Sequence, residues 1–390
     1  MGAGMKMHRA RVRHRRSVLA RLRPGRAYSR GEIARETGLS PATVSRITRD
    51  LVRRRVLREV PESRGTSAGR PVRFLEVNGT YGRVLGISLL YPAARALVLD
   101  FRGEILAEEA REIEPAGGRE AVLGPLRDLV RSVSIPRRRG AGRLIAAGLS
   151  IPGQWDRERG ISIQYPRVGD WKDVPVRDLL AKWSGLPSFL VGYAPSLALA
   201  EYGGRSGEEP SGLLAVEVDE NIALGVIVNG TLLEGASGNA GELGHITIDP
   251  EGPVCYCGNA GCLETLATCR AVVEGARRME GGGGPRTYED VVRRAEEGDP
   301  FSARLLERTA ATLGMGLASA VNLFNPDVLV LNGRFFGAGS RVVEPLRESL
   351  RSHALPNSVR RLTIERSSLG PRAAALGAGI HAIGRVLQDL

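Results

Sequence analysis

Hydrophobic positions in the first 78 residues recur at helical spacing before they give way to short apolar runs. Apolar residues at i, i+1 and i+4 predict a helix over residues 16–22. A second helix follows, opened by the capping-box pair Ser29 and Glu32. Gly38 suits the left-handed backbone that ends helices, so this second helix is short.

A third helix is predicted over residues 41–53, with Ser40 as its N-cap and a proline in its first turn. Val44, Ile47 and Leu51 form its buried stripe. Its other face suits the major groove, where arginine bonds guanine and threonine or alanine contacts the thymine methyl group. The candidate DNA-reading residues of this segment are Ser40, Ala42, Thr43, Ser45, Arg46 and Arg49.

Two apolar runs, residues 56–60 and 72–77, are predicted to pair as strands around a polar, glycine-containing loop. Such a hairpin after these helices is typical of a winged helix-turn-helix. Arg64 and Arg70 in the loop are candidate contacts to a minor groove. The alternative is a helical-hairpin interaction module whose arginines are only solvated.

From residue 81 onward, apolar strands alternate with amphipathic helices in two similar halves. Strands are predicted at 84–90, 94–100, 105–110, 144–150, 213–218, 222–228 and 328–331, and helices at 119–133, 302–323, 341–352 and 372–387. This repetition predicts a duplicated α/β fold with a cleft between two lobes.

Charge is unevenly distributed along the 390 residues. Residues 1–78 hold 20 Lys and Arg against 6 Asp and Glu, whereas the rest holds 35 against 37. Because the excess falls on a segment predicted to fold, it favours double-stranded DNA as the partner.

No apolar run approaches the roughly 20 residues that cross a bilayer. The basic N-terminal stretch lacks the apolar segment of a secretory signal. We therefore expect a cytoplasmic protein without membrane contact, in which thiols stay reduced.

Candidate metal ligands lie close together in the second half: His245, Cys255, Cys257 and Cys262. Three thiolates and one imidazole complete the tetrahedral shell of Zn²⁺ and leave no open position for water, so the predicted zinc is structural. The alternative is a loop of unpaired or disulfide-bonded thiols. Glu242 and Glu264 flank the ligands and could face a small molecule.

These motifs resemble those of the ROK family (repressors, open reading frames and sugar kinases). The resemblance covers nearly the whole chain. It rests on residues 241–245 with 255–264, and it continues at 152–153, 171–175, 185–187, Glu201, 325–327 and Gly333. The winged head, with its Ala-Gly-Arg-Pro wing at 68–71, is similar to that of the family's xylose-type and N-acetylglucosamine-type repressors.

The resemblance implies an α/β fold: a winged helix-turn-helix over residues 1–78, then a two-lobed, actin-like and sugar-kinase-like body of duplicated ribonuclease H-like lobes. The lobes are expected over 79–200 and 201–390, with the zinc knuckle in the second and the last helix packing back on the first. It also implies that the cysteines and His245 bind zinc, and that Glu242, His245 and Glu264 stand where kinase members hold sugar hydroxyls. The two glutamates could instead brace the zinc knuckle.

The chain departs from the pattern of the family's kinases at their phosphate loops and catalytic motif. Residues 88–92 read Ser-Leu-Leu-Tyr-Pro in place of a glycine-rich phosphate loop, and Ala194 occupies the general-base position. Residues 219–223 begin with two carboxylates that would repel a polyphosphate. Arg167 replaces an asparagine and, if it points inward, favours an acidic or phosphorylated sugar. We therefore expect no enzymatic activity.

The leading hypothesis is a sequence-specific transcriptional regulator, a repressor of carbohydrate-related genes with a catalytically dead sensor body. Two or four copies, as a homodimer or a dimer of dimers, would read a near-palindromic operator. A sugar or sugar derivative would shift the population between DNA-competent and incompetent states. The alternatives are a regulator whose body docks a protein partner and, with least support, a sugar kinase.

Overall fold

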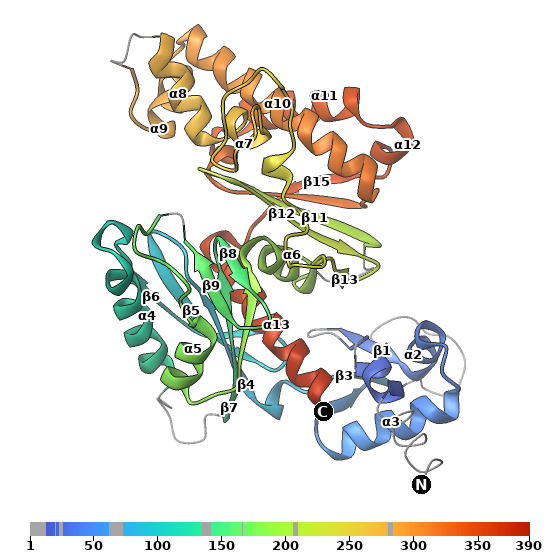
Figure 1. Ribbon diagram of the computed structural model, residues 1–390. Coiled ribbons are helices and arrows are strands. Elements are labelled where there is room, and N and C mark those ends of the chain that lie inside the picture. The colour runs from blue at the N-terminus through green and yellow to red at the C-terminus, as the bar shows by residue number, and fades with distance from the viewer. Residues whose placement is uncertain are drawn as a thin grey trace. The chain divides into compact units, whose positions relative to one another are not determined.

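The computed structural model describes residues 13–19, 21–22, 26–61, 73–134, 142–165, 167–205, 210–279 and 284–390. The chain forms two compact units (Figure 1): Met1–Ser206 together with Arg372–Leu390, and Gly207–Pro371. The C-terminal segment thus returns to the first unit. Within the described ranges, no helix has both the length and the apolar character that a membrane crossing requires.

The winged head belongs to the first unit. It comprises a helical stretch at residues 13–19, α2 (Arg30–Thr37), α3 (Pro41–Arg53) and an antiparallel sheet. In spatial order the strands are β1 (Ala27–Ser29), β3 (Phe74–Val77) and β2 (Leu57–Val60). The first helix lies earlier than the predicted 16–22. Strand β1 was not predicted, because a three-residue strand that ends at a helix cap has no readable periodicity.

The local signals that predicted α2 and α3 are present as hydrogen bonds. Ser29 Oγ accepts the Glu32 amide at 3.1 Å, and Glu32 Oε2 accepts the Ser29 amide at 2.7 Å, which completes the capping box. Gly38 ends α2 at φ 65°, and Ser40 caps α3 ahead of Pro41. The predicted bounds of α3 are confirmed.

A five-stranded sheet forms the lobe of the first unit. In spatial order its strands are β10 (Ser188–Gly192), β7 (Leu144–Ile151), β4 (Arg83–Ser88), β5 (Ala93–Asp100) and β6 (Ile105–Glu112). Its helices are α4 (Arg119–Ser134), α5 (Val176–Ser184), α6 (Tyr193–Gly203) and α13 (Ala373–Asp389), and β8 (Gln154–Asp156) pairs with β9 (Ile161–Gln164) in a separate ribbon. Since β4, β7 and β10 run parallel, the residues that follow them share one edge of the sheet.

Helix α13 lies against this sheet at a distance that only glycine permits. A Cβ on Gly86 of β4 would stand 2.1 Å from the Ala375 carbonyl oxygen, and one on Gly148 of β7 would stand 2.0 Å from another carbonyl of α13. A Cβ on Gly377 would lie 1.8 Å from the Ser196 carbonyl oxygen in α6. Backbone therefore packs directly on backbone, and α13 is held between the sheet and α6.

The end of α13 also contributes to the core of the winged head. Ile383 and Leu387 are buried in one cluster with apolar residues of β1, β2 and β3 and with Phe101 of the lobe. Arg54, which caps the end of α3, donates from Nη1 to the Leu390 carbonyl oxygen at 3.2 Å. The head and the lobe of the first unit thus share one hydrophobic core.

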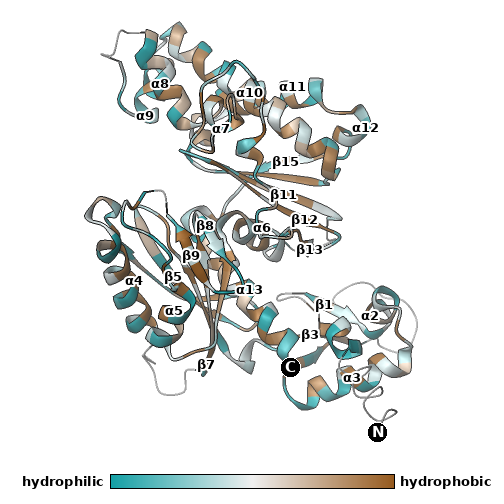
Figure 2. Ribbon diagram, in the orientation of Figure 1, coloured by the Kyte–Doolittle hydropathy of each residue, from teal (hydrophilic) through white to brown (hydrophobic). Residues whose placement is uncertain are grey.

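The second unit repeats the plan of the first. In spatial order its strands are β13 (Thr231–Leu232), β12 (Ile222–Val228), β11 (Gly212–Val218), β14 (Val328–Asn332) and β15 (Thr363–Arg366). The helices are α7 (Leu263–Leu266), α8 (Cys269–Met279), α9 (Tyr288–Glu296), α10 (Pro300–Phe324), α11 (Ser340–His353) and α12 (Pro356–Val359). Figure 2 shows β11 as predominantly hydrophobic, as a central strand covered by helices must be. The predicted duplicated α/β fold is confirmed.

Candidate functional site

Helix α3 divides into a buried face and an outer face, as its sequence predicts. Val44 and Leu51 are fully buried, and Ile47 is 8% exposed. On the other side Ala42, Arg46 and Arg49 are exposed, while Thr43 and Ser45 are half-buried. The small and cationic side chains predicted to read DNA therefore lie on the face that the core leaves open.

The hydroxyl groups at the start of α3 bond to each other. Ser40 Oγ accepts the Thr43 amide at 3.3 Å and donates to Thr43 Oγ1 at 2.9 Å. A base contact by Ser40 or Thr43 would compete with this cap.

Arginines of the head divide into paired and unpaired groups. Asp50 binds Arg15 at 2.8 Å and Arg53 at 2.5 Å. Although partial burial opposes it, hydrogen bonds from Arg53 and Arg15 lower the pKa of Asp50. Within the described part of the chain, Arg46 and Arg49 have no ion pair or side-chain hydrogen bond. Their donors remain available to an anionic partner.

Thr48 is a residue of the head that sequence reasoning missed. It lies on α3, is fully buried, and accepts a hydrogen bond at Oγ1 from Arg30 Nε at 3.2 Å. The same arginine binds Glu59 of β2 at 2.7 Å, so Arg30 joins α2, α3 and the wing sheet. The predicted wing contacts Arg64 and Arg70 lie outside the described residues.

The predicted metal ligands converge in the second unit. One ligand atom each from His245, Cys255, Cys257 and Cys262 lies within 4.8 Å of all the others. The Cys257 and Cys262 sulfurs are 3.6 Å apart, and Cys255 Sγ is 3.6 Å from His245 Nδ1. A disulfide requires about 2.05 Å between sulfurs. Around tetrahedral Zn²⁺, with bonds of about 2.3 Å to sulfur and 2.0 Å to nitrogen, S–S and S–N separations are about 3.8 and 3.5 Å. The donor set and its spacing therefore fit a tetrahedral metal ion.

The orientation of His245 matches this arrangement. Its Nδ1 faces the Cys255 sulfur, and its Nε2 lies 3.0 Å from the Tyr256 hydroxyl. A metal-ligating histidine commonly donates from its other nitrogen to a neighbouring oxygen, which fixes ring and tautomer. The Tyr256 hydroxyl is placed for that role.

Tight turns bring the ligands together. Gly258 has φ 96° and Gly261 φ 63°, and a Cβ on Gly261 would stand 1.5 Å from the Asp249 carbonyl oxygen. A hydrogen bond with the backbone of Asn259 lowers the pKa of the Cys257 thiol. Burial raises the pKa of the Cys262 thiol to about 12. A bound cation would hold both as thiolates, because the deprotonated sulfur is the form that ligates a metal ion.

Glu264 follows the last cysteine and is only 2% exposed. Its Oε2 accepts the Ile222 amide at 3.1 Å, while its Oε1 is buried without a hydrogen-bond partner among the described residues. Burial raises the pKa of Glu264; the charge of nearby Glu242 acts in the same direction, and the bond from Ile222 opposes it. Glu242 itself is exposed, at the start of the 3-10 turn Leu243–His245.

Positions that carry chemistry in the family's kinases are also placed. Ala194 is the second residue of α6, after β10. Tyr91, which follows β4, is 45% exposed, and the Arg167 guanidinium lies 5.4 Å from its ring centroid. Asp219 and Glu220 form the turn between β11 and β12.

A winged helix-turn-helix joined to two α/β lobes, with a Cys₃His cluster in the second, defines a class of protein in which a helix-turn-helix head is fused to a sugar-kinase-like scaffold. Family models match the ROK family over residues 85–384 and the IclR helix-turn-helix domain over residues 17–61. The chain belongs to the ROK family, and the resemblance read from its motifs is confirmed.

Named relatives include both repressors and kinases. The xylose repressor of Caldicellulosiruptor bescii is 29% identical over 385 residues, which cover 96% of this chain and 95% of the repressor. A solved ROK family transcriptional regulator, a homologue of the Escherichia coli Mlc protein, has a TM-score of 0.77 at 26% identity and covers 98% of this chain and 97% of its own. The ROK hexokinase of Thermus thermophilus has a TM-score of 0.67 at 32% identity, covering 78% of this chain and 99% of its own.

Proposed function

We propose that this protein is a DNA-binding transcriptional repressor whose body responds to a sugar. The observation that carries the proposal is the outer face of α3, where Arg46 and Arg49 are exposed and, within the described residues, unpaired. The similar proteins named as a xylose repressor and a transcriptional regulator match nearly the full length of the chain, winged head included.

The head would place α3 in a major groove. Arg46 and Arg49 supply bidentate donors for guanine, and Ala42 with Thr43 suits a thymine methyl group. Arg64 and Arg70 of the wing are proposed to reach the adjacent minor groove. A single head of this size reads few base pairs, so we propose a homodimer, or a dimer of dimers, on a near-palindromic operator.

Glu264 supports a sugar as the effector. A buried carboxylate oxygen without a partner costs free energy unless a donor reaches it, and a sugar hydroxyl is such a donor. Glu242 is proposed to contribute a further hydrogen bond, whereas the two ring nitrogens of His245 already face the Cys255 sulfur and the Tyr256 hydroxyl.

The Cys₃His cluster is proposed to hold structural Zn²⁺ through His245, Cys255, Cys257 and Cys262. The ion would supply a cross-link between the segments around residues 245 and 255–262 and would leave no site for activated water. Reduced thiols of this kind fit a cytoplasmic location.

Phosphoryl transfer is not part of the proposal. Ala194 cannot accept the proton of a sugar hydroxyl, and Asp219 and Glu220 place negative charge where a phosphate loop would stand. Tyr91 and Pro92 lack the close backbone approach that glycines provide.

The test of DNA recognition uses the native protein and the DNA upstream of its own gene at about 150 mM salt, with random DNA of equal length as competitor. We expect a footprint with two-fold symmetry. Arg46→Ala should weaken binding by about 1–3 kcal/mol and relax the base preference at one position of each half-site. Arg351→Ala, an exposed arginine of α11, serves as the matched control and should have no effect. Equal affinity for upstream and random DNA would refute the proposal.

The test of the effector titrates D-xylose, D-glucose and their phosphorylated forms into the protein–operator complex. One sugar should release the DNA. Glu264→Ala should abolish that release while sugar-free operator affinity stays unchanged. Silence across a wider sugar panel would favour a body that docks a protein partner.

A further inference from the structure

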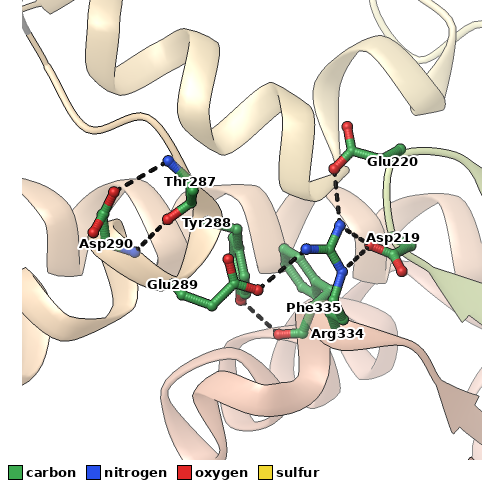
Figure 3. A network of polar contacts seen from close by, with 8 residues as sticks. All are labelled: Asp219, Glu220, Thr287, Tyr288, Glu289, Asp290, Arg334 and Phe335. Atoms are coloured by element: carbon green, nitrogen blue, oxygen red, sulfur yellow. Dashed lines mark hydrogen bonds and ion pairs between the residues drawn. The ribbon is translucent and has the colours of Figure 1, made fainter. Parts of the chain in front are cut away.

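Arg334 stands directly after the strand β14 and Gly333, and it binds three carboxylates from two other segments (Figure 3). Its Nε donates to Asp219 at 2.7 Å, its Nη2 to Glu220 at 2.9 Å and its Nη1 to Glu289 at 3.2 Å. A guanidinium carries five donors in one plane, so a single side chain can hold all three. The hydrogen bond to Asp219 raises the pKa of Arg334 above its usual value, partial burial opposes this shift, and the charges of Asp219 and Glu289 add to it.

The backbone that presents Arg334 is itself tightly held. Gly333 has φ 105°, and a Cβ there would stand 2.2 Å from the Val218 carbonyl oxygen. Tyr288, which begins α9, donates from its buried hydroxyl to the Phe335 carbonyl oxygen at 2.6 Å and stacks on the Phe335 ring. Arg334 and Glu289 therefore come from two segments that are fixed to each other.

The turn that Arg334 binds, residues 219–221, immediately precedes Ile222, whose amide bonds Glu264. The Asp219 amide donates to the Asn221 carbonyl at 3.0 Å, and the Asp219 carbonyl accepts the Cys269 amide at 2.9 Å. The next residue, Ile222, donates its amide to Glu264 Oε2 at 3.1 Å. One turn thus carries the carboxylates that Arg334 binds and the amide that orients Glu264.

Charge makes the turn dependent on the arginine. The side chains of Arg334, Asp219, Glu220 and Glu289 are 50, 35, 36 and 59% exposed, so each ion pair by itself is weak. Removing the single cation, however, leaves three carboxylates facing one another, and like charges repel. Loss of Arg334 therefore removes the side-chain bonds that hold the turn and leaves uncompensated negative charge beside it.

We propose that Arg334 is a positioning residue for the effector site: it holds the 219–221 turn so that the Ile222 amide fixes Glu264, whose second oxygen stays available to a ligand. The inference rests on the proposed role of Glu264 in binding the effector. At the position of the second phosphate loop of the family's kinases, this chain would use an ion cluster to shape a sugar-binding carboxylate.

The experiment measures amide hydrogen exchange at Ile222 in the full-length, metal-loaded protein without sugar or DNA. Arg334→Ala should speed exchange at Ile222 about tenfold or more, as expected when a hydrogen bond to a buried charged group is lost. Glu264→Ala should have the same effect. In the double variant the two effects should not add, because both remove one bond. Arg334→Lys keeps the charge without the planar fork and should restore part of the protection.

Arg293→Ala is the matched control. Arg293 lies on α9 with its side chain 58% exposed and binds Glu297 at 3.0 Å and Asp290 at 3.6 Å, and among the described residues it makes no ion pair or hydrogen bond with the 219–221 turn. It should leave exchange at Ile222 unchanged. Additive effects of Arg334→Ala and Glu264→Ala, or faster exchange in the turn alone with Ile222 still protected, would overturn the proposal. These readouts involve neither operator nor sugar, so their failure is separable from failure of the repressor function.

Discussion

The buried end of α13 offers a direct test of the core shared by the winged head and its lobe. Leu387 is 1% exposed and lies in the cluster that includes strands of the head. Leu387→Ala removes three heavy atoms from this core and leaves a cavity. Such substitutions cost about 2–5 kcal/mol, depending on how far the surroundings collapse. Backbone contacts of α13 at Gly148 and Gly377 restrict that collapse, so we expect a cost of about 3 kcal/mol, roughly a hundredfold in the unfolding equilibrium.

The assay is urea unfolding followed by tryptophan fluorescence. Trp155, Trp171 and Trp183 are all the tryptophans of the chain, and all three lie in the first unit, so the signal reports this unit alone. The neighbouring exposed residue provides the control, Gln388→Ala, which should shift the midpoint hardly at all. Operator affinity should also fall for Leu387→Ala, since the head loses part of its support. A midpoint shift no larger than that of the control would refute the shared core.

Three further predictions follow from the Cys₃His cluster, the sheet and the last helix. Cys257→Ser should abolish binding of one zinc per chain, measured by a chromophoric chelator, whereas Cys269→Ala, outside the cluster, should retain it; retention in the first variant would contradict the assigned ligand set. Gly148→Ala places a methyl group 2.0 Å from a carbonyl oxygen of α13 and should lower stability in urea unfolding by about 1–3 kcal/mol, whereas Gly169→Ala, with open space around it, should be neutral. Burial and the charges of Arg385 and Arg157 lower the pKa of His381 to about 4, so the unfolded chain takes up a proton near pH 6.5 that the folded protein binds only near pH 4. Stability should therefore fall as pH drops from about 6.5 to 4, and His381→Gln should flatten that part of the pH profile; an unchanged profile would refute the assignment.

Features that depend on residues close together in the sequence could be predicted from the sequence. The capping box at Ser29 and Glu32, the stop at Gly38 and the stripe of α3 each depend on residues at most a few positions apart, and the structure has all of them. The Cys₃His cluster belongs to the same class, because its four residues lie within 245–262 and two glycine turns fold them back. Such features arise from local backbone geometry, which periodicity and spacing record.

Short strands were not predicted, because each forms by pairing with a strand far away in the sequence. β1 has three residues and exists through pairing with β3, and β15 has four and exists through pairing with β14. Neither has room for a readable alternation of hydrophobic and polar positions. Both strands form because a partner strand, distant or separate in the sequence, supplies their backbone hydrogen bonds.

The sequence by itself determined the winged head, the duplicated α/β scaffold, the four residues of the Cys₃His cluster and the departures from the kinase motifs, since residue type and spacing carry that information. Only the tertiary structure decided that Arg334 gathers carboxylates from the turn after β11 and from α9, that Glu264 keeps a buried oxygen without a partner in the described chain, and that α13 enters the core of the head. Each of these depends on segments tens to hundreds of residues apart. Their proximity follows from packing of the whole fold, which no local pattern records.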